Sequence, residues 1–257
     1  MKVTVCQLRN DPDPLREDWQ KLVGHVQQQG SELVLLPEMC FYPWLCRSRQ
    51  PDPALWEASV ETHRQWLERL EELDTAAVAG SVPVIAGNRR FNEAFIWSPQ
   101  SGYRPAHRKT FLPDEDGFWE ASWYDRGPLS FAAVETSVAR LGFLICTEMW
   151  FAERARAYGR AGVHLLLVPR ATPLSSADKW LAGGRAAAVV SGAFCLSSCL
   201  GGVDRRGMQW AGQGWIIGPE EGEILGLTTS SEPFITMDID LHSAENAKHT
   251  YPRYVPE

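Results

Sequence analysis

The chain lacks the features that would place it in a membrane, outside the cell or on nucleic acid. Its longest apolar runs fall well short of a membrane span, and its first residues, MKVTVCQLRNDPDP, hold too short an apolar core for a secretory signal. No stretch of lysine and arginine forms a basic stripe, and the formal net charge is −7. We therefore expect a cytoplasmic protein whose partners include neither membrane nor nucleic acid.

Paired cysteines are missing as well. The six cysteines stand at positions 6, 40, 46, 146, 195 and 199, and no two of them form a C-x-x-C pair. A chain without a secretion signal is expected to keep its cysteines as free thiols. We also expect no metal site built from them.

The composition is that of a soluble globular protein with a large core. Hydrophobic residues make up 44% and charged residues 22% of the 257 residues. The chain has no low-complexity linker, and no internal repeat is visible at the periods typical of repeat proteins. We expect one domain over residues 1–257.

Strands and helices are expected to alternate twice along the chain. In the first half, the patterns predict strands at 2–8, 32–36 and 82–87, helices at 14–29 and 54–73, and a hairpin over 91–108. After an irregular stretch from 112 to 128, they predict strands at 129–134, 138–146, 163–169, 194–200, 214–218, 223–225 and 234–240, with helices at 151–162 and 176–193. Two successive β-α-β-α-β halves indicate an α/β protein with largely buried sheets.

Three polar residues follow apolar runs directly. Glu38 ends LVLLPE, Lys109 closes the hairpin in HRK, and Cys146 ends GFLIC. Functional groups of α/β sheets gather beyond the carboxyl ends of the strands, so these side chains could meet there. A thiol becomes a nucleophile when a base takes its proton and a positive charge favours the thiolate. Taken alone, a cysteine such as Cys146 is more often a buried core thiol than a nucleophile.

The chain resembles the carbon–nitrogen hydrolases of the nitrilase superfamily. LVLLPEMCF resembles the segment with the family's catalytic glutamate, HRKTFLP its lysine segment, and GFLICTEMWFAE its nucleophile turn. FWEASWYDRG is similar to the segment with the family's second glutamate, and the likeness continues nearly from end to end. The resemblance implies a four-layer α-β-β-α sandwich of two similar halves that forms a homodimer or higher homo-oligomer, with the helix at 151–162 helping to form the dimer.

The same resemblance implies roles for four side chains. Cys146 would be the nucleophile, Glu38 the general base and acid, and Lys109 the stabiliser of the oxyanion together with the backbone N–H of Thr147. Glu120 would be the supporting carboxylate. Its acidic neighbours could supply the same group, and they are Asp114, Glu115, Asp116 and Asp125. No metal or organic cofactor is needed for this chemistry.

The substrate is expected to be a small amide or carbamoyl compound. True nitrilases of the family usually carry tryptophan after the nucleophile, whereas this chain has the small Thr147. Nitrile hydrolysis, acyl transfer to an amine and a non-catalytic scaffold stay open as alternatives. Arg170 follows a buried strand and would either bind a substrate carboxylate or form an internal salt bridge.

Three tryptophans and one histidine lie near these motifs. Trp150, Trp180 and Trp119 are candidates for shaping the pocket, although core packing is the default for tryptophan. His107 lies two residues before Lys109 on the same expected strand. We expect its side chain to point away from the lysine.

Overall fold

Residues 1–256 are described in the computed structural model, and their strands form two sheets joined through β1 (Lys2–Leu8). In the first sheet, β1, β2 (Leu33–Glu38) and β3 (Ala77–Ala86) are parallel neighbours. The antiparallel strands β4 (Arg89–Ser98) and β5 (Gly102–Arg108) extend this sheet on one side, and β12 (Phe234–Asp238) pairs with β1 on the other.

The second sheet starts from the end of β1, where Gln7 and Leu8 pair with β9 (Phe194–Leu200). Next to β9 lie the parallel strands β8 (Leu165–Arg170) and β7 (Arg140–Phe143), followed by the short β6 (Val134–Glu135). On its other side, β9 pairs with β10 (Trp215–Ile217), which pairs with β11 (Ile224–Leu227).

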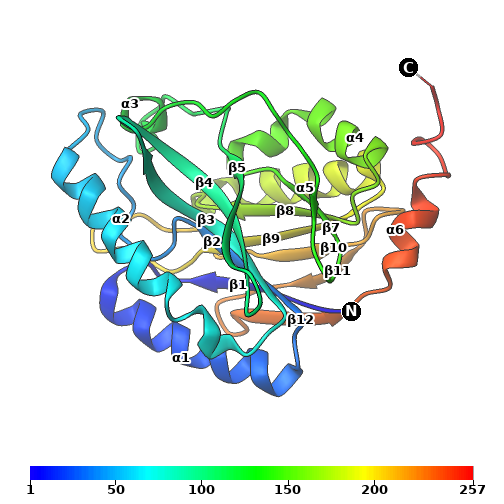
Figure 1. Ribbon diagram of the computed structural model, residues 1–257, viewed down its shortest axis with the longest axis horizontal. Helices are drawn as coiled ribbons and strands as arrows, with labels where there is room; N and C mark the ends of the chain where they lie inside the picture. The colour runs from blue at the N-terminus through cyan, green and yellow to red at the C-terminus, as the bar shows by residue number, and fades with distance from the viewer. Residues whose placement is uncertain (257) are drawn as a thin grey trace.

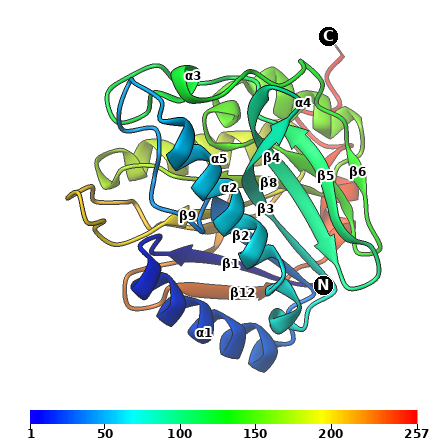
Figure 2. The same cartoon turned by 60° about the vertical axis from the view of Figure 1, so that its left-hand side comes forward.

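Helices cover the outer face of each sheet. The long helices α1 (Pro12–Gln29) and α2 (Pro53–Leu67) lie on the first sheet, and α4 (Ala152–Arg160) and α5 (Ala177–Ser191) lie on the second (Figures 1 and 2). Shorter elements are η1 (Leu70–Leu73), α3 (Glu120–Trp123), η2 (Cys146–Trp150), η3 (Leu174–Ser176) and α6 (Leu241–Ala247). None of the helices within residues 1–256 has the length and apolar character needed to cross a membrane.

The alternation of side chains along β1 explains the four layers. Val3 and Val5 pack into one core with Leu141 and Leu167 of the second sheet, so these side chains lie between the sheets. Cys6 and Leu8 point to the opposite face and pack in a second core with the buried stripe of α1. This arrangement confirms the α-β-β-α sandwich that the resemblance implies.

Some predicted elements differ from the observed ones. Residues 194–200 form a strand as predicted, but the strand predicted at 129–134 is wrong, because only Val134 joins the short β6. Leu129 in that stretch is 63% exposed, and Phe131 packs on His107 instead of entering a sheet. The predicted helix at 54–73 ends at Leu67 and resumes as η1, and the short helices α3 and α6 were not predicted.

Candidate active site

The three polar strand ends meet at the seam between the two sheets. Glu38 is the last residue of β2, Lys109 follows β5 directly, and Cys146 opens η2, which lies between β7 and α4. The side chains of Glu38 and Lys109 are fully buried, and Cys146 is 4% exposed. Residues 38, 109 and 146 therefore share one buried region although β2 and β7 belong to different sheets.

Lys109 is held between two carboxylates. Its Nζ lies 2.7 Å from Glu38 Oε1 and 2.6 Å from Glu120 Oε2. Glu120 begins α3 and is also buried, and its carboxylate accepts a hydrogen bond from the Tyr124 hydroxyl. Of the acidic residues expected to compete for this place, Asp125 instead pairs with Arg89 at 3.2 Å.

Glu38 has two further hydrogen-bond donors. Asn92 Nδ2 of β4 donates to Oε1 at 2.8 Å, and the backbone N–H of Ala171 donates to Oε2 at 3.1 Å. Ala171 directly follows β8, so its bond fixes Glu38 against the second sheet. Asn92 was not among the predicted site residues, although an amide inside the largely apolar stretch FNEAFIW is a signal that a buried partner is needed.

The backbone is strained at two residues of the site. Cys146 has φ of 47° and Met39, directly after Glu38, has φ of 43°. Residues other than glycine adopt these left-handed values at a cost of roughly 1–3 kcal/mol, and such costs persist where the surroundings enforce them. The sharp turn at Cys146 places the thiol at the junction of β7 and η2, at the wall of a cavity.

The protonation states follow from burial and mutual charge. Burial opposes the charge of Lys109, but Glu120 and Glu38 more than offset this and raise its pKa well above the usual value. Burial raises the pKa of Glu120 to about 7, against the opposing effect of Lys109. Burial and the charge of Glu38 raise the pKa of the Cys146 thiol well above its usual value. The resting thiol is therefore protonated and needs a base.

A cavity of about 450 Å³ opens onto the thiol. Its lining includes Cys146, Thr147 and Glu120 together with Trp150 and Trp180. The lining residues that carry further charge are Asp114, Glu115 and Lys179. Among residues 1–256, Trp119 is not part of this lining, whereas its neighbour Phe118 is. The dimensions suit a small organic molecule.

Arg170 lies outside this lining, fully buried at the end of β8. Its guanidinium donates to Ser197 Oγ at 2.7 Å, to Thr172 Oγ1 at 2.9 Å and to the Gln213 carbonyl. It also stacks on Trp215, with 3.9 Å between Cζ and the ring centre. Among the described residues, its hydrogen-bond acceptors are all neutral, so the internal salt bridge, one of the two alternatives for Arg170, is not formed.

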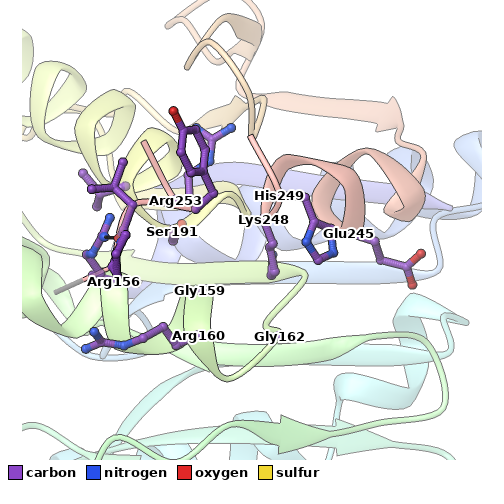
Figure 3. Close-up of a pocket in the computed structure, with 13 residues that line it drawn as sticks. Arg156, Gly159, Arg160, Gly162, Ser191, Glu245, Lys248, His249 and Arg253 are labelled. Carbon is purple, nitrogen blue, oxygen red and sulfur yellow. Dashed lines mark hydrogen bonds between the residues drawn. The ribbon is translucent and has the colours of Figure 1, made fainter. Parts of the chain in front are cut away.

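A second cavity, of about 520 Å³, lies between α4, α6 and the chain end. Figure 3 shows Arg156 and Arg160 of α4 on one side and Lys248 and Arg253 on the other. Lys248 and Arg253 donate to main-chain carbonyls, which marks them as supports of the helix ends. No cysteine is among the described residues that line it, so the thiol chemistry belongs to the first cavity.

Comparisons with known proteins give the family. The profile of the family described as carbon-nitrogen hydrolase matches residues 2–249. The chloroplastic omega-amidase of Arabidopsis thaliana is 27% identical, covering 97% of this chain and 70% of the relative, and the omega-amidase of Mus musculus is 27% identical over 90% and 84%. N-carbamoylputrescine amidase of Solanum tuberosum is 23% identical over 91% and 84%.

Solved structures show the same fold. A carbon-nitrogen hydrolase from Helicobacter pylori aligns with a TM-score of 0.86 at 22% identity, covering 99% of this chain and 94% of the other. An amidase from Nesterenkonia, in which acrylamide has added to the active-site cysteine, aligns with a TM-score of 0.74 at 20% identity, covering 96% of each chain.

Proposed function

Because the chain belongs to the carbon-nitrogen hydrolase family, we propose that this hydrolase cleaves the C–N bond of a small amide or carbamoyl compound through an acyl-enzyme on Cys146. The observation that carries the proposal is the buried cluster in which Lys109 Nζ contacts both Glu38 and Glu120, beside a thiol that lines a cavity. The cluster joins a nucleophile, a base and a fixed positive charge, as such chemistry requires.

In the first half of the reaction, Glu38 takes the thiol proton and the Cys146 sulfur attacks the carbonyl carbon of the substrate. This transfer moves one negative charge from the carboxylate to the sulfur and leaves the total charge of the site unchanged. Both charges lie beside the ammonium of Lys109, so the buried site does not have to accommodate an additional ion. That balance makes a thiol of raised pKa usable at neutral pH.

Lys109 and the backbone N–H of Thr147 would then stabilise the oxyanion of the tetrahedral intermediate, each by a factor of roughly 100 or more in rate. Glu38 returns its proton to the leaving nitrogen as the C–N bond breaks, and ammonia or an amine departs. The acyl group remains on Cys146 as a thioester. Glu38 next takes a proton from water, whose oxygen attacks the thioester. The C–S bond then breaks, the acid is released, and Glu38 gives its proton to the sulfur, which restores the thiol.

Glu120 supports this cycle by holding Lys109. When Glu38 is protonated it no longer pairs with the ammonium as a carboxylate, and Glu120 keeps Lys109 in place at 2.6 Å. Tyr124 in turn orients Glu120. We therefore assign Glu120 a supporting role and not the role of base.

The charges at the mouth of the cavity bear on the substrate. Asp114 and Glu115 provide two carboxylates, and Lys179 provides one ammonium. This balance favours substrates whose far end is neutral or positively charged, such as carbamoyl amines, over substrates that carry two carboxylates. Of the described residues that line the cavity, Lys179 is the cation available to a single substrate carboxylate, because Arg170 is buried and bonded elsewhere.

The test is ammonia release from a panel of small amides, ω-amides, carbamoyl amines and nitriles. Cys146→Ala should lower turnover of the best substrate by roughly 1000-fold or more, because no other group replaces the thiolate. Cys195→Ala, which removes a buried thiol of β9 that does not line the cavity, serves as the matched control. Mass spectrometry with a slow substrate should find the acyl group on Cys146, and an adduct on another cysteine would contradict the mechanism.

A further inference from the structure

Glu148 is a fully buried carboxylate that has no part in the proposed reaction. It nevertheless contacts both the segment that carries the lysine and the turn that carries the thiol. Its Oε1 accepts the backbone N–H of Thr110 at 2.7 Å, and its Oε2 accepts the backbone N–H of Ile145 at 2.9 Å. Thr110 directly follows Lys109, and Ile145 directly precedes Cys146. One carboxylate therefore joins the lysine segment to the nucleophile turn.

His107 completes this arrangement. Its Nε2 lies 2.9 Å and 2.8 Å from the two oxygens of Glu148, and its Nδ1 lies 3.2 Å from the Ser130 carbonyl oxygen. Because a carbonyl oxygen can only accept a hydrogen bond, Nδ1 carries a hydrogen and donates it to Ser130. Nε2 and the Glu148 carboxylate are joined by a second hydrogen bond, whose proton lies between them. The ring also packs on Phe131 with 4.7 Å between ring centres, which fixes its plane.

Sheet pairing alone does not set the distance between Lys109 and Cys146. β5, which precedes the lysine, is the edge strand of the first sheet, and β7, which precedes the thiol, lies near the opposite end of the strand order in the second. The main chain of Lys109 is tied to the first sheet by its N–H to the Asn92 carbonyl at 2.9 Å. The Glu148 carboxylate supplies a direct link from this segment to the thiol's own turn.

From this geometry we infer that Glu148 and His107 are positioning residues, which set Lys109 against Cys146 without touching the substrate. The inference rests on the proposed function for its catalytic consequence. A buried anion with four short contacts is well suited to the task, because each contact is charge-assisted and directional. Losing this registration by about 1 Å would cost roughly 100-fold in rate.

Three substitutions test the inference. Glu148→Gln keeps the side-chain shape but loses one acceptor, His107→Leu removes the donor to Glu148, and His107→Gln keeps one donor. We expect kcat to fall roughly 100-fold in Glu148→Gln and His107→Leu with KM within about threefold of wild type, and to stay within about tenfold in His107→Gln. A higher kcat in His107→Gln than in His107→Leu would show that the hydrogen bond to Glu148 matters, and not only the space that the side chain fills.

Tyr158→Phe is the matched control for lost stability. The Tyr158 hydroxyl is buried and bonds to the N–H and carbonyl of Phe143 on β7, so its loss weakens the strand before the thiol without touching the lysine segment. Unfolding midpoints confirm that every variant is folded at the assay temperature. We expect Tyr158→Phe to be less stable but to keep kcat within about threefold of wild type. An equal loss of kcat in Tyr158→Phe would overturn the inference, as would wild-type kcat in folded Glu148→Gln or His107→Leu.

A second readout separates this inference from the proposed function. The rate at which iodoacetamide alkylates Cys146 requires no substrate, and it should fall about tenfold in His107→Leu because the ammonium no longer favours the thiolate. If wild type hydrolyses no compound of the panel, the proposed function fails and the alkylation rate alone decides on Glu148 and His107. If Glu148→Gln does not fold, the comparison of His107→Gln with His107→Leu decides, and equal values in both would overturn the inference.

Discussion

Lys109, Glu38 and Glu120 form a group of buried charges that would be a poor choice for stability alone. Removing charged groups from water costs several kcal/mol per ion, and apolar residues of similar volume often stabilise a core as well or better. Two buried carboxylates that each lie within 2.7 Å of one buried ammonium are therefore best explained by chemistry. What the buried site must accommodate is the total charge of these groups and the thiol. Proton transfer from the thiol to Glu38 leaves this total unchanged.

His63 gives a pH prediction at the same scale. This buried residue of α2 donates from Nδ1 to the Ser59 carbonyl at 2.8 Å, and its Nε2 accepts the N–H of Phe41 at 3.3 Å, in the turn that follows Glu38. Burial lowers the pKa of His63 to about 4 from an ordinary value of 6.5. Between these values the unfolded chain binds more protons than the folded one, so stability should fall as the pH drops from about 6.5 to about 4, by roughly 3 kcal/mol in total.

The measurement is denaturant unfolding of wild type and His63→Gln at about pH 7 and about pH 4. Carboxylates titrate in both proteins, so the difference between the two pH-dependent losses isolates the histidine. The loss should be smaller in His63→Gln by roughly 3 kcal/mol. Equal losses in the two proteins would show that His63 does not stay neutral in the fold.

The sequence alone predicted those site residues that stand at a recognisable place along the chain, at the end of an apolar run. Glu38, Lys109 and Cys146 each end an apolar run, and the structure brings all three to one seam. The partners of Glu148 and Arg170 could not be predicted, because they come from other strands and loops and no local pattern reports such pairing. His107 was expected to point away from Lys109, and it contacts Glu148, 41 residues further along the chain.

At the scale of elements, the periodicity of apolar residues predicted the buried strands and the long helices. It failed for short segments, whose structure is determined by packing against the rest of the chain. The stretch 129–134 is largely apolar, as a strand can be, but Leu129 is left exposed and only Val134 pairs with a neighbouring strand. α3 has four residues, too few to show a helical period, yet it delivers Glu120. Short elements of this kind depend on contacts that the sequence does not display.

The close packing of α4 on α5 leads to a prediction for Gly159. A Cβ at this position would lie 2.4 Å from the Ser191 carbonyl oxygen, which belongs to the backbone and cannot give way. Gly159→Ala should therefore lower the free energy of unfolding by roughly 1–3 kcal/mol, as overpacking typically does. Gly24→Ala on the exposed side of α1, where nothing lies within 4 Å, should instead stabilise the protein by roughly 0.5–1 kcal/mol. Denaturant unfolding measures both, and an unchanged Gly159→Ala would mean that the helices separate easily.

At the scale of the whole molecule, the site is a product of two sheets meeting. The Ala171 N–H fixes Glu38 of the first sheet to the end of β8 in the second, and the Thr110 N–H fixes the lysine segment to Glu148 beside the thiol. Each bond crosses between the halves that the sequence shows as two similar β-α-β-α-β units. Because the cluster of catalytic side chains is drawn from both halves, it cannot form until both halves are folded and docked. Catalysis therefore depends on the complete sandwich.

The last prediction concerns association of two chains. The family resemblance implies a dimer formed near α4, and this helix has small or charged residues on its solvent side, including Ala152, Glu153 and Arg160. α4 begins directly after η2, whose Trp150 is 40% exposed at the cavity, so a partner on this face would contact the mouth of the site and support the turn at Cys146. We expect a homodimer of twice the 28.8 kDa chain mass in sedimentation at micromolar concentration.

Ala152→Arg should yield a monomer with lower kcat, because a long charged side chain at the interface would be buried without a partner. Ala58→Arg, on the exposed side of α2 in the opposite helical layer, is the matched control and should leave the dimer intact (Figure 1). A monomeric wild type would contradict the prediction. A dimeric Ala152→Arg variant would place the interface on another face, and a fully active monomer would show that the Cys146 turn needs no support from a partner.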